Sequence, residues 1–283
     1  MNEIEIQNFW DKHPCGDELV GGIGKYHFDY EQFFNTYDSF RYTKESHILK
    51  CLDKIDFKGK TVLEIGLGQG ADSEQIIKRG GVWSGLDITP ESISRVQTRL
   101  YLRNLPYKSL NLGSVLDMPF EDNKFDIVFS HGVLHHVPDI VKAQQEIHRI
   151  LKPNGVLIVM LYSKYSLNYL LSISLIRRVG LILLYYFFSP SNEIVKQHIK
   201  NAKAIGLWNY LKMNTFIHRN TDGPLNPYSK VYDYQLVEKD FNKFDIISSY
   251  KQFMHAPPLY VKWLPLENKL GWHLWVHLHP KGK

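Results

Sequence analysis

A glycine-rich turn follows directly on the apolar run at residues 61–65, and its glycines are Gly66, Gly68 and Gly70. The apolar run is typical of a strand buried on both faces, and glycine lets the backbone turn sharply and approach a ligand closely. Residues 71–78 are expected to form a helix whose first N–H groups point over the turn. A second predicted strand, at 82–87, ends in Asp87, an acid suited to a ribose diol. These residues predict a site for a nucleotide-type ligand.

The turn alone does not identify that ligand. The spacing Gly66-x-Gly68-x-x-Ala71 also satisfies the looser dinucleotide fingerprint with alanine in the last place. An NAD-linked enzyme is therefore one reading of the turn, and it predicts that a nicotinamide dinucleotide protects the protein against thermal unfolding.

Three further motifs follow the turn in order: Gly113-Ser-Val-Leu-Asp-Met-Pro-Phe120, Phe125-Asp-Ile-Val-Phe-Ser-His-Gly-Val-Leu-His-His-Val-Pro-Asp139 and Leu151-Lys-Pro-Asn-Gly-Val-Leu-Ile-Val-Met160. Together with the turn they resemble the class I S-adenosylmethionine (SAM)-dependent methyltransferases, especially the branch similar to the ubiquinone and menaquinone biosynthesis C-methyltransferases. The resemblance covers about residues 60 to 162. It implies an α/β fold with a Rossmann-like, seven-stranded sheet and helices on both faces. It also implies SAM as cofactor and S-adenosylhomocysteine (SAH) as product.

Carried over residue by residue, the resemblance places the three glycines under the methionine part of SAM, Asp87 at the ribose hydroxyls and Ile88 against the adenine. Members of the family usually have an acid at the adenine amino group, where this chain has Ser114. A serine can accept that hydrogen bond, but charge-assisted bonds are roughly twice as strong, so adenine recognition is expected to depend on the Val115 backbone. The predicted cofactor site comprises Glu64, Gly66, Leu67, Gly68, Gly70, Asp87, Ile88, Ser114, Val115 and Ser130.

Methyl transfer from a sulfonium is an in-line displacement that needs alignment and, for a protonated acceptor, a base. His131 ends the predicted fourth strand, and open α/β sheets bind their ligands at the carboxyl ends of strands. His131 is therefore the first candidate for a base; a role in shaping the pocket is the alternative. The other catalytic candidates are His135, in a Leu-His-His-x-Pro-Asp pattern common in the family, and Tyr162, just past the fifth strand.

A polar loop at residues 221–230 contributes Asp222, Asn226 and Tyr228 as candidates for substrate binding. Methyltransferases of similar architecture carry a like Asp-Gly-x-x-Asn-Pro loop. A structural turn is the alternative, because Asp, Gly, Asn and Pro each favour turns. In the N-terminal segment, Arg41 and Tyr42 are candidates to hold the carboxylate of the cofactor.

The chain is longer than one Rossmann-like core requires, with 283 residues and 44% hydrophobic content. Strand-like patterns at 244–249 and 271–279 indicate that the chain returns to the sheet after an insertion. We predict one discontinuous domain with an N-terminal lid at 1–58, a SAM-binding core at 59–162, a helical cap at 163–235 between the fifth and sixth strands, and the last two strands at 236–283.

The cap contains the apolar segment 167–188, which Arg177 and Arg178 interrupt at its centre. Two arginines would cost roughly 2.5–3.5 kcal/mol each in a bilayer, so a pair of helices covering the active site is predicted rather than a membrane span. Interfacial binding near a lipid substrate is the alternative. Residues 1–160 carry a net charge of −4 and residues 161–283 one of +9. The basic half is either a solvated face or a surface that attracts an anionic partner.

Other features narrow the class of protein. The two cysteines, Cys15 and Cys51, argue against a disulfide framework, and the N-terminus lacks the pattern of a signal peptide, so a cytoplasmic protein is expected. His273, His277 and His279 share one face of the final strand, but no cysteine or carboxylate cluster accompanies them, and no metal site is predicted. The fourth strand lacks an Asn/Asp-Pro-Pro-aromatic signature, and no Pro-Cys nucleophile for cytosine C5 chemistry is predicted, so no nucleic-acid substrate is expected.

The leading hypothesis is a SAM-dependent methyltransferase that acts on a small metabolite, which could be anionic, with the acceptor atom undetermined. One alternative is methylation of a lipid or quinone headgroup at the membrane surface. An alternative from another class is a SAM-binding protein that does not methylate, which the departure at Ser114 supports. Homo-oligomers and peripheral membrane contact are left open.

Overall fold

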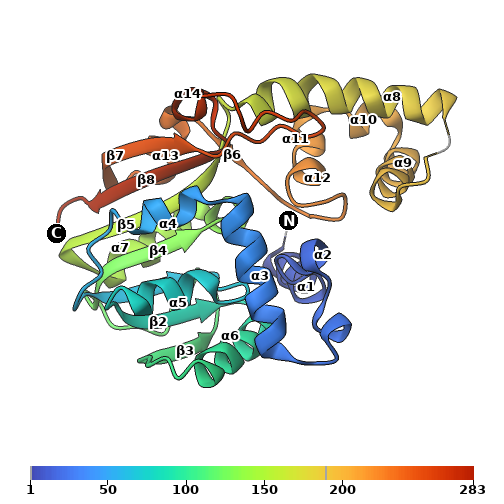
Figure 1. Cartoon of the computed structure of the whole chain (residues 1–283). Helices are drawn as coiled ribbons and strands as arrows, with labels where there is room; N and C mark the ends of the chain where they lie inside the picture. Colours follow the sequence, from blue (N-terminus) through green and yellow to red (C-terminus); the bar gives the residue numbers. More distant parts are fainter. Residues whose placement is uncertain (1, 189) are drawn as a thin grey trace.

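The computed structural model describes residues 2–188 and 190–283, and its centre is one sheet with the strand order β3-β2-β1-β4-β5-β8-β7 (Figure 1). The first five strands are parallel and β8 is antiparallel to both neighbours. The strands are β1 Thr61–Ile65, β2 Val82–Asp87, β3 Ser109–Leu112, β4 Phe125–His131, β5 Leu151–Ser163, β6 Val231–Tyr232, β7 Phe244–Gln252 and β8 His273–Pro280. The predicted Rossmann-like α/β fold is confirmed. Two-residue β6, paired with β5, adds an eighth strand to the predicted seven.

Helices cover both faces of the sheet, which explains why its central strands are apolar throughout. Along β5, Leu157, Val159 and Leu161 pack with helices α7 (Ile140–Ile150) and α13 (Tyr234–Asp240). The alternate residues Ile158 and Met160 pack on the other face, as the two-residue period of a strand requires. That face is covered by α4 (His47–Leu52), α5 (Ala71–Lys78) and α6 (Pro90–Leu102).

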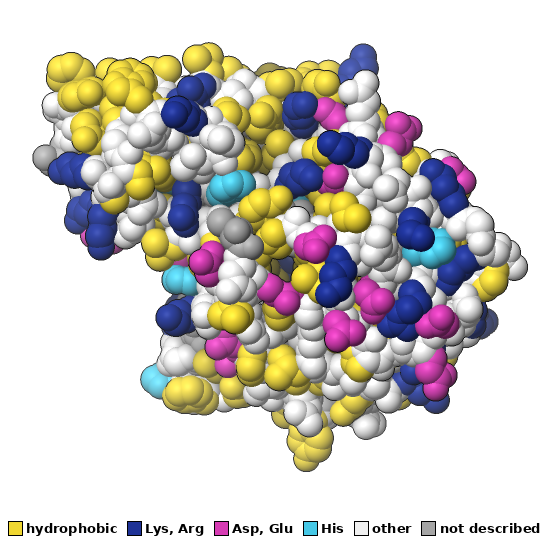
Figure 2. Space-filling view, turned by 180° about the vertical axis from the view of Figure 1, so that it is seen from behind, with side chains coloured by type: hydrophobic (Ala, Val, Ile, Leu, Met, Phe, Trp, Pro, Cys, Tyr) yellow, Lys and Arg dark blue, Asp and Glu magenta, His cyan; other side chains and the backbone are white. Residues whose placement is uncertain are grey.

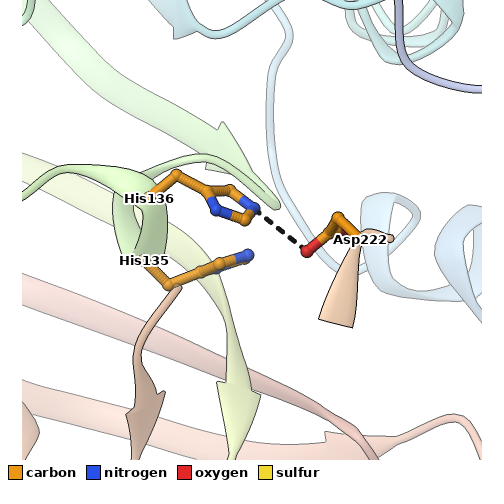
Figure 3. A group of neighbouring side chains, drawn as sticks. All are labelled: His135, His136 and Asp222. Carbon is orange, nitrogen blue, oxygen red and sulfur yellow. Dashed lines mark ion pairs between the residues drawn. The ribbon is translucent and has the colours of Figure 1, made fainter. Parts of the chain in front are cut away.

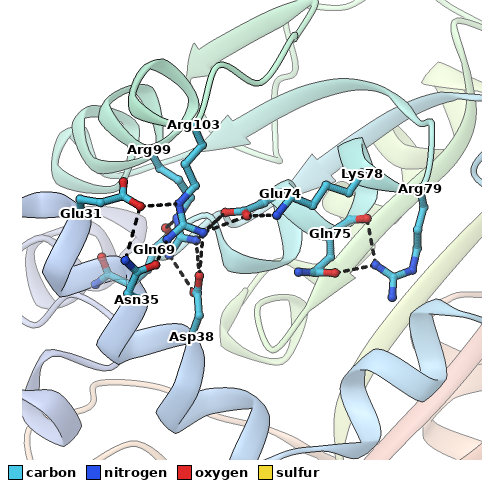
Figure 4. A network of polar contacts seen from close by, with 10 residues as sticks. All are labelled: Glu31, Asn35, Asp38, Gln69, Glu74, Gln75, Lys78, Arg79, Arg99 and Arg103. Carbon is cyan, nitrogen blue, oxygen red and sulfur yellow. Dashed lines mark hydrogen bonds and ion pairs between the residues drawn. The ribbon is translucent and has the colours of Figure 1, made fainter.

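The N-terminal segment crosses the carboxyl edge of the sheet and comprises α1 (Glu3–Lys12), α2 (Asp17–Val20), η1 (Ile23–Tyr26) and α3 (Tyr30–Lys44). Ion pairs fix α3 to α5 and α6 (Figure 4). The fully buried guanidinium of Arg99 lies 2.8 Å from Asp38 and 2.9 Å from Glu74, and Arg103 lies 2.7 Å from Glu74. A buried charge is tolerated only when it is paired. This network therefore holds the N-terminal segment in place over the edge.

The cap extends beyond the sheet on the same side as the N-terminal helices (Figure 1). Its elements are η3 Asn168–Arg177, α8 Arg178–Phe187, α9 Glu193–Ile205, α10 Leu207–Tyr210, α11 Met213–Phe216 and α12 His218–Thr221. It has an apolar core of its own, which includes Ile173, Leu181, Ala202, Tyr210 and Phe216.

The predicted pair of helices at 167–188 is wrong, because η3 and α8 form one uninterrupted helical run. Arg177 does not break the run, since its side chain turns toward the protein and donates to the carbonyls of Asn220 (2.8 Å) and Pro257 (3.1 Å). By length and composition alone, the run from Asn168 to Phe187 is apolar enough to cross a membrane, with a mean hydropathy of 1.6, and 17% of its apolar window is buried.

Candidate active site

A pocket lies at the carboxyl ends of the strands, where β1, β2 and β4 end at Ile65, Asp87 and His131. Parallel strands bring these ends to one edge of the sheet. Most of the predicted cofactor residues line the pocket, namely Glu64, Gly66, Leu67, Gly68, Asp87, Ile88 and Val115. The other three, Gly70, Ser114 and Ser130, do not line it. The structure therefore brings together residues from three strand ends around one cavity.

The glycine turn is closed by Asp87. One oxygen of its carboxylate accepts from the Leu67 N–H at 2.6 Å, and the other accepts from the N–H and hydroxyl of Thr89, both at 2.8 Å. Gly66 has a φ of 78°, and a Cβ there would lie 2.2 Å from the side chain of Val133. Only glycine fits this position. Burial raises the pKa of Asp87 although these three bonds oppose the shift.

Below the turn, Glu64 is buried and accepts a hydrogen bond from the indole N–H of Trp83 at 2.8 Å. Burial, with the nearby charge of Asp72, raises the pKa of Glu64 to about 8. The carboxyl is therefore largely protonated at neutral pH and stands at the floor of the pocket.

At the other end of the pocket, Ser114 donates a short hydrogen bond to Glu3 of helix α1 and accepts one from the Leu116 N–H at 2.9 Å. Glu3 itself lines the pocket. Helix α1 is also fixed there by Gln7, which donates to the Ile88 carbonyl at 2.8 Å. The N-terminal helix thus supplies a carboxylate at the place where this chain lacks the acid of the Gly113–Phe120 motif.

The third part of the pocket contains Arg41, Asp72 and His131. The Arg41 guanidinium lies 2.7 Å from Asp72, while its Nε is buried without a hydrogen-bond partner. Tyr42 lies behind this pair, with its hydroxyl 3.4 Å from Asp72. Burial opposes ionisation of Asp72, but Arg41 and His131 outweigh it and hold its pKa well below its usual range. The free Nε of Arg41 is a donor suited to an anionic group.

His131 Nδ1 lies 2.6 Å from Asp72 Oδ2. An ionised carboxylate can only accept, so Nδ1 carries a proton, and in the neutral form of the ring Nε2 then has the lone pair. The Arg41 Nη2 lies 3.0 Å from the same Nδ1 because both donors converge on Asp72. A carboxylate that fixes the tautomer and orientation of a histidine is an arrangement that serves a general base.

The remaining catalytic candidates, His135 and Tyr162, do not line the pocket. Their rings lie 3.9 Å apart between centroids, and Tyr162 donates to Asp222 Oδ1 at 2.7 Å. Burial lowers the pKa of His135 well below its ordinary value and raises that of Tyr162 well above its own. Both are therefore neutral at physiological pH. The adjacent His136, which was not among the predicted catalytic residues, does line the pocket.

The three candidates from the polar loop have different surroundings. Asp222 faces His136, with 3.4 Å between Oδ2 and Nε2. The Tyr228 carbonyl accepts from His136 Nδ1 at 2.7 Å. Asn226 is fully buried and donates to Ser229 Oγ at 2.8 Å, which closes the loop on itself. Of the three, Asp222 is the side chain directed toward the pocket residue His136.

Three residues of this region were not predicted as site residues from the sequence. Asp72 follows Gly70 by two positions, and an acid so close to a ligand-binding turn was an available signal. His136 directly follows His135, which was predicted as a catalytic residue. Glu3 lies 111 positions from its partner Ser114, and no local pattern indicates that contact.

The fold is thus a Rossmann-like sheet with a pocket at its carboxyl edge, and an acid at the end of the second strand and Arg41 line that pocket. Residues 63–159 match the family of methyltransferase domains. This part of the chain is a class I SAM-dependent methyltransferase domain.

Three similar proteins illustrate the extent of the match. Phosphoethanolamine N-methyltransferase 2 of Caenorhabditis elegans is 34% identical over 119 residues, which is 41% of this chain and 27% of that protein. Ubiquinone biosynthesis O-methyltransferase of Histophilus somni is 32% identical over 102 residues, which is 35% of this chain and 43% of that protein. A SAM-dependent methyltransferase of Aquifex aeolicus has the same fold, with a TM-score of 0.52 and 14% sequence identity. The superposition covers 88% of this chain and 97% of that one. The match thus spans less than half of the two curated relatives.

Proposed function

We propose that the protein transfers a methyl group from SAM to a small-molecule acceptor. One observation carries the proposal: a single pocket extends from Glu3 and Asp87, at the nucleoside end, to His131, whose free nitrogen is fixed by Asp72. Cofactor-binding groups and a base therefore open into the same cavity.

Different pocket residues would contact different parts of the cofactor. Asp87 would accept from the ribose hydroxyls with its remaining lone pairs, and Ile88 and Val115 would contact the adenine. The unpartnered Nε of Arg41 would bind the carboxylate of the methionine part. SAM supplies an activated methyl group when bound, and this chain's residues orient it.

In the transfer, a lone pair of the acceptor forms a bond to the methyl carbon while the carbon–sulfur bond breaks. The electron pair of that bond returns to sulfur, which loses its positive charge. For an acceptor that holds a proton, His131 Nε2 takes the proton and Asp72 stabilises the resulting imidazolium. Positioned bases of this kind contribute about 10²- to 10⁴-fold in rate.

The test begins with calorimetric titration of SAM into the protein, followed by measurement of SAH formation with a panel of hydroxyl, amine, phenol and phosphate-bearing acceptors. His131→Ala should bind SAM within about threefold of wild type and lose about 10²-fold or more of acceptor-dependent SAH formation. His148→Ala, outside the pocket, is the matched control. A folded protein that fails to bind SAM, or that is protected by NAD instead, would contradict the proposal. SAM binding without any transfer would favour the non-methylating alternative.

A second candidate acceptor is a lipid or quinone headgroup at a membrane surface. The helical run 168–187 exposes large apolar side chains, including Leu175 (54%) and Phe187 (71%). Figure 2 shows apolar side chains along the outer edge of the cap, with Lys and Arg side chains below them. On α9, Lys196, Lys200 and Lys203 are exposed and follow helical spacing, so they share one face. Apolar and cationic groups side by side suit an anionic bilayer.

This candidate is tested by sedimentation with vesicles of anionic or zwitterionic lipid. We expect binding to the anionic vesicles and loss of it when Lys196, Lys200 and Lys203 are replaced by Glu. Replacement of Lys58 and Lys60 by Glu, on the core, should leave binding unchanged. Equal recovery with both kinds of vesicle would contradict the role of the lysines, and no recovery with either would eliminate the membrane-surface acceptor.

A further inference from the structure

We propose that His135, His136 and Asp222 bind a divalent transition-metal ion next to the cofactor pocket. The two histidines end η2 (Leu134–His136) and the aspartate directly follows α12, so they come from opposite sides of the site. Figure 3 shows nitrogen atoms of both imidazoles directed into the same space as the Asp222 carboxylate. One ligand atom from each of the three residues lies within 4.8 Å of the others.

The atoms that face this space make no hydrogen bonds, and the nearest approach among them is the 3.4 Å ion pair between His136 Nε2 and Asp222 Oδ2. Both ring nitrogens of His135, Nε2 of His136 and Oδ2 of Asp222 are buried without a hydrogen bond. One nitrogen of His135 lies near the Met160 backbone, which leaves the other to face His136 and Asp222. The exposed fraction of His135 is 0% and that of His136 is 4%. Buried polar atoms almost always have a hydrogen-bond partner, so three that lack one and face each other, one from each residue, call for an explanation.

The tautomer of His136 indicates which kind of group would fill the space between it and Asp222. Its Nδ1 donates to the Tyr228 carbonyl at 2.7 Å, and a carbonyl cannot donate, so Nδ1 carries a proton. Nε2 of a neutral His136 then presents a lone pair to an oxygen of Asp222 at 3.4 Å. Two acceptors that face each other require a cation between them. A proton would satisfy this pair and leave His135 without a partner, whereas a metal ion would satisfy all three residues.

The geometry fits such an ion. Two ligands that each lie about 2.1 Å from a tetrahedral metal are about 3.4 Å apart, and 3.4 Å separates His136 Nε2 from Asp222 Oδ2. Two of the three ligands, Asp222 and His136, are also oriented by hydrogen bonds from outside the site. Tyr162 donates to the second carboxylate oxygen at 2.7 Å, and the Tyr228 carbonyl fixes the ring of His136. Groups of this kind orient metal ligands and tune their basicity.

Two imidazoles and one carboxylate favour zinc or ferrous iron over magnesium or calcium, which prefer oxygen ligands. Three protein ligands leave at least one coordination position open. His136 lines the cofactor pocket, so that position would face it. If the proposed function holds, an acceptor with a hydroxyl, phenol or phosphate oxygen would occupy the open position, and a metal-bound hydroxyl loses its proton more readily.

The experiment titrates Co²⁺ and Zn²⁺ into chelator-treated full-length protein, with visible absorption reporting the Co²⁺ coordination and elemental analysis reporting bound Zn²⁺. We expect one ion per chain and a Co²⁺ spectrum that Zn²⁺ displaces. His136→Ala and Asp222→Ala should each weaken binding at least about 100-fold, and Tyr162→Phe about 10-fold or more, as loss of an orienting group does.

Matched controls are His27→Asn and Asp245→Ala, both at exposed positions, which should bind the metal as wild type does. Circular dichroism and SAM titration of each variant show that it is folded. Absence of a Co²⁺ spectrum in folded protein, or a spectrum that survives His136→Ala and Asp222→Ala, would overturn the metal site and leave a protonated ion pair. Because metal binding needs neither SAM nor acceptor, its failure is distinguishable from failure of methyl transfer.

Discussion

The cofactor side and the cap side of the site are built by different means. On the cofactor side, Gly66, Gly68 and Asp87 come from consecutive strand ends and turns, and local hydrogen bonds hold them. On the cap side, His136, Tyr162 and Asp222 come from three separated segments that meet through long-range contacts. Local motifs fix the geometry of the first group, and tertiary packing fixes that of the second. SAM binding and acceptor binding should therefore respond separately to mutation.

The largest expected effect concerns the stability of the core. Glu64 has a pKa raised to about 8, so the folded state holds its proton more tightly than the unfolded state does. The stabilisation is fully present below the ordinary pKa of a glutamate and is lost as pH rises through about 8. The loss should reach on the order of 3–5 kcal/mol. Urea unfolding of the protein without SAM, at several pH values, measures it.

In the same experiment, Glu64→Gln should be nearly insensitive to pH in this range, because it keeps an acceptor for Trp83 without an ionisable group. Exposed Glu121→Gln should follow the wild type. Identical pH profiles for wild type and Glu64→Gln would show that the buried carboxyl is not protonated in the folded core.

Asp87→Ala should weaken SAM binding about 10- to 100-fold, since hydrogen bonds to a charged acceptor contribute about 1.5–3 kcal/mol. Calorimetric titration measures the change, with Asp53→Ala, an exposed acid paired with Arg79, as control. Asp87→Asn keeps an acceptor and should recover part of the affinity. An unchanged affinity in Asp87→Ala would place the cofactor elsewhere in the pocket.

Arg177→Ala should loosen the cap and leave the cofactor side intact. It removes the donors to the Asn220 and Pro257 carbonyls, which we expect to cost about 2 kcal/mol. Hydrogen exchange should accelerate within residues 168–187 while SAM affinity stays within about twofold. The adjacent Arg178→Ala, whose one hydrogen bond is a 3.4 Å contact to Ser174, is the control. A comparable loss of SAM affinity in Arg177→Ala would show that the two sides are coupled.

The smallest expected effect is at the nucleoside end. Glu3→Gln replaces the carboxylate bonded to Ser114 by a neutral amide, and charge-assisted bonds are roughly twice as strong as neutral ones. SAM affinity should fall about two- to fivefold. Glu5→Gln, exposed on the same helix, should bind as wild type does. Equal affinities of the two variants would mean that Glu3 does not contact the adenine.

The comparison also explains which predictions succeeded. The strand at 82–87 and the helix at 71–78 have the predicted bounds, and Thr89 caps the helix that begins at Pro90, because short-range patterns determine these elements. The pair of helices predicted within residues 167–188 is one continuous run, in which Arg177 donates to carbonyls more than 40 positions away. A local pattern cannot reveal such a partner.

The sequence by itself determined the class of fold, the cofactor and the wall of the pocket at the glycine turn, because those depend on neighbouring residues and on the two-residue period of buried strands. Only the tertiary structure brought Glu3 to Ser114, Asp72 to His131, and Asp222 to His135 and His136. The residues of these contacts are 111 positions apart for Glu3 and Ser114, 59 for Asp72 and His131, and 86 for His136 and Asp222. Their formation depends on how the lid and the cap pack against the sheet, which no local pattern encodes.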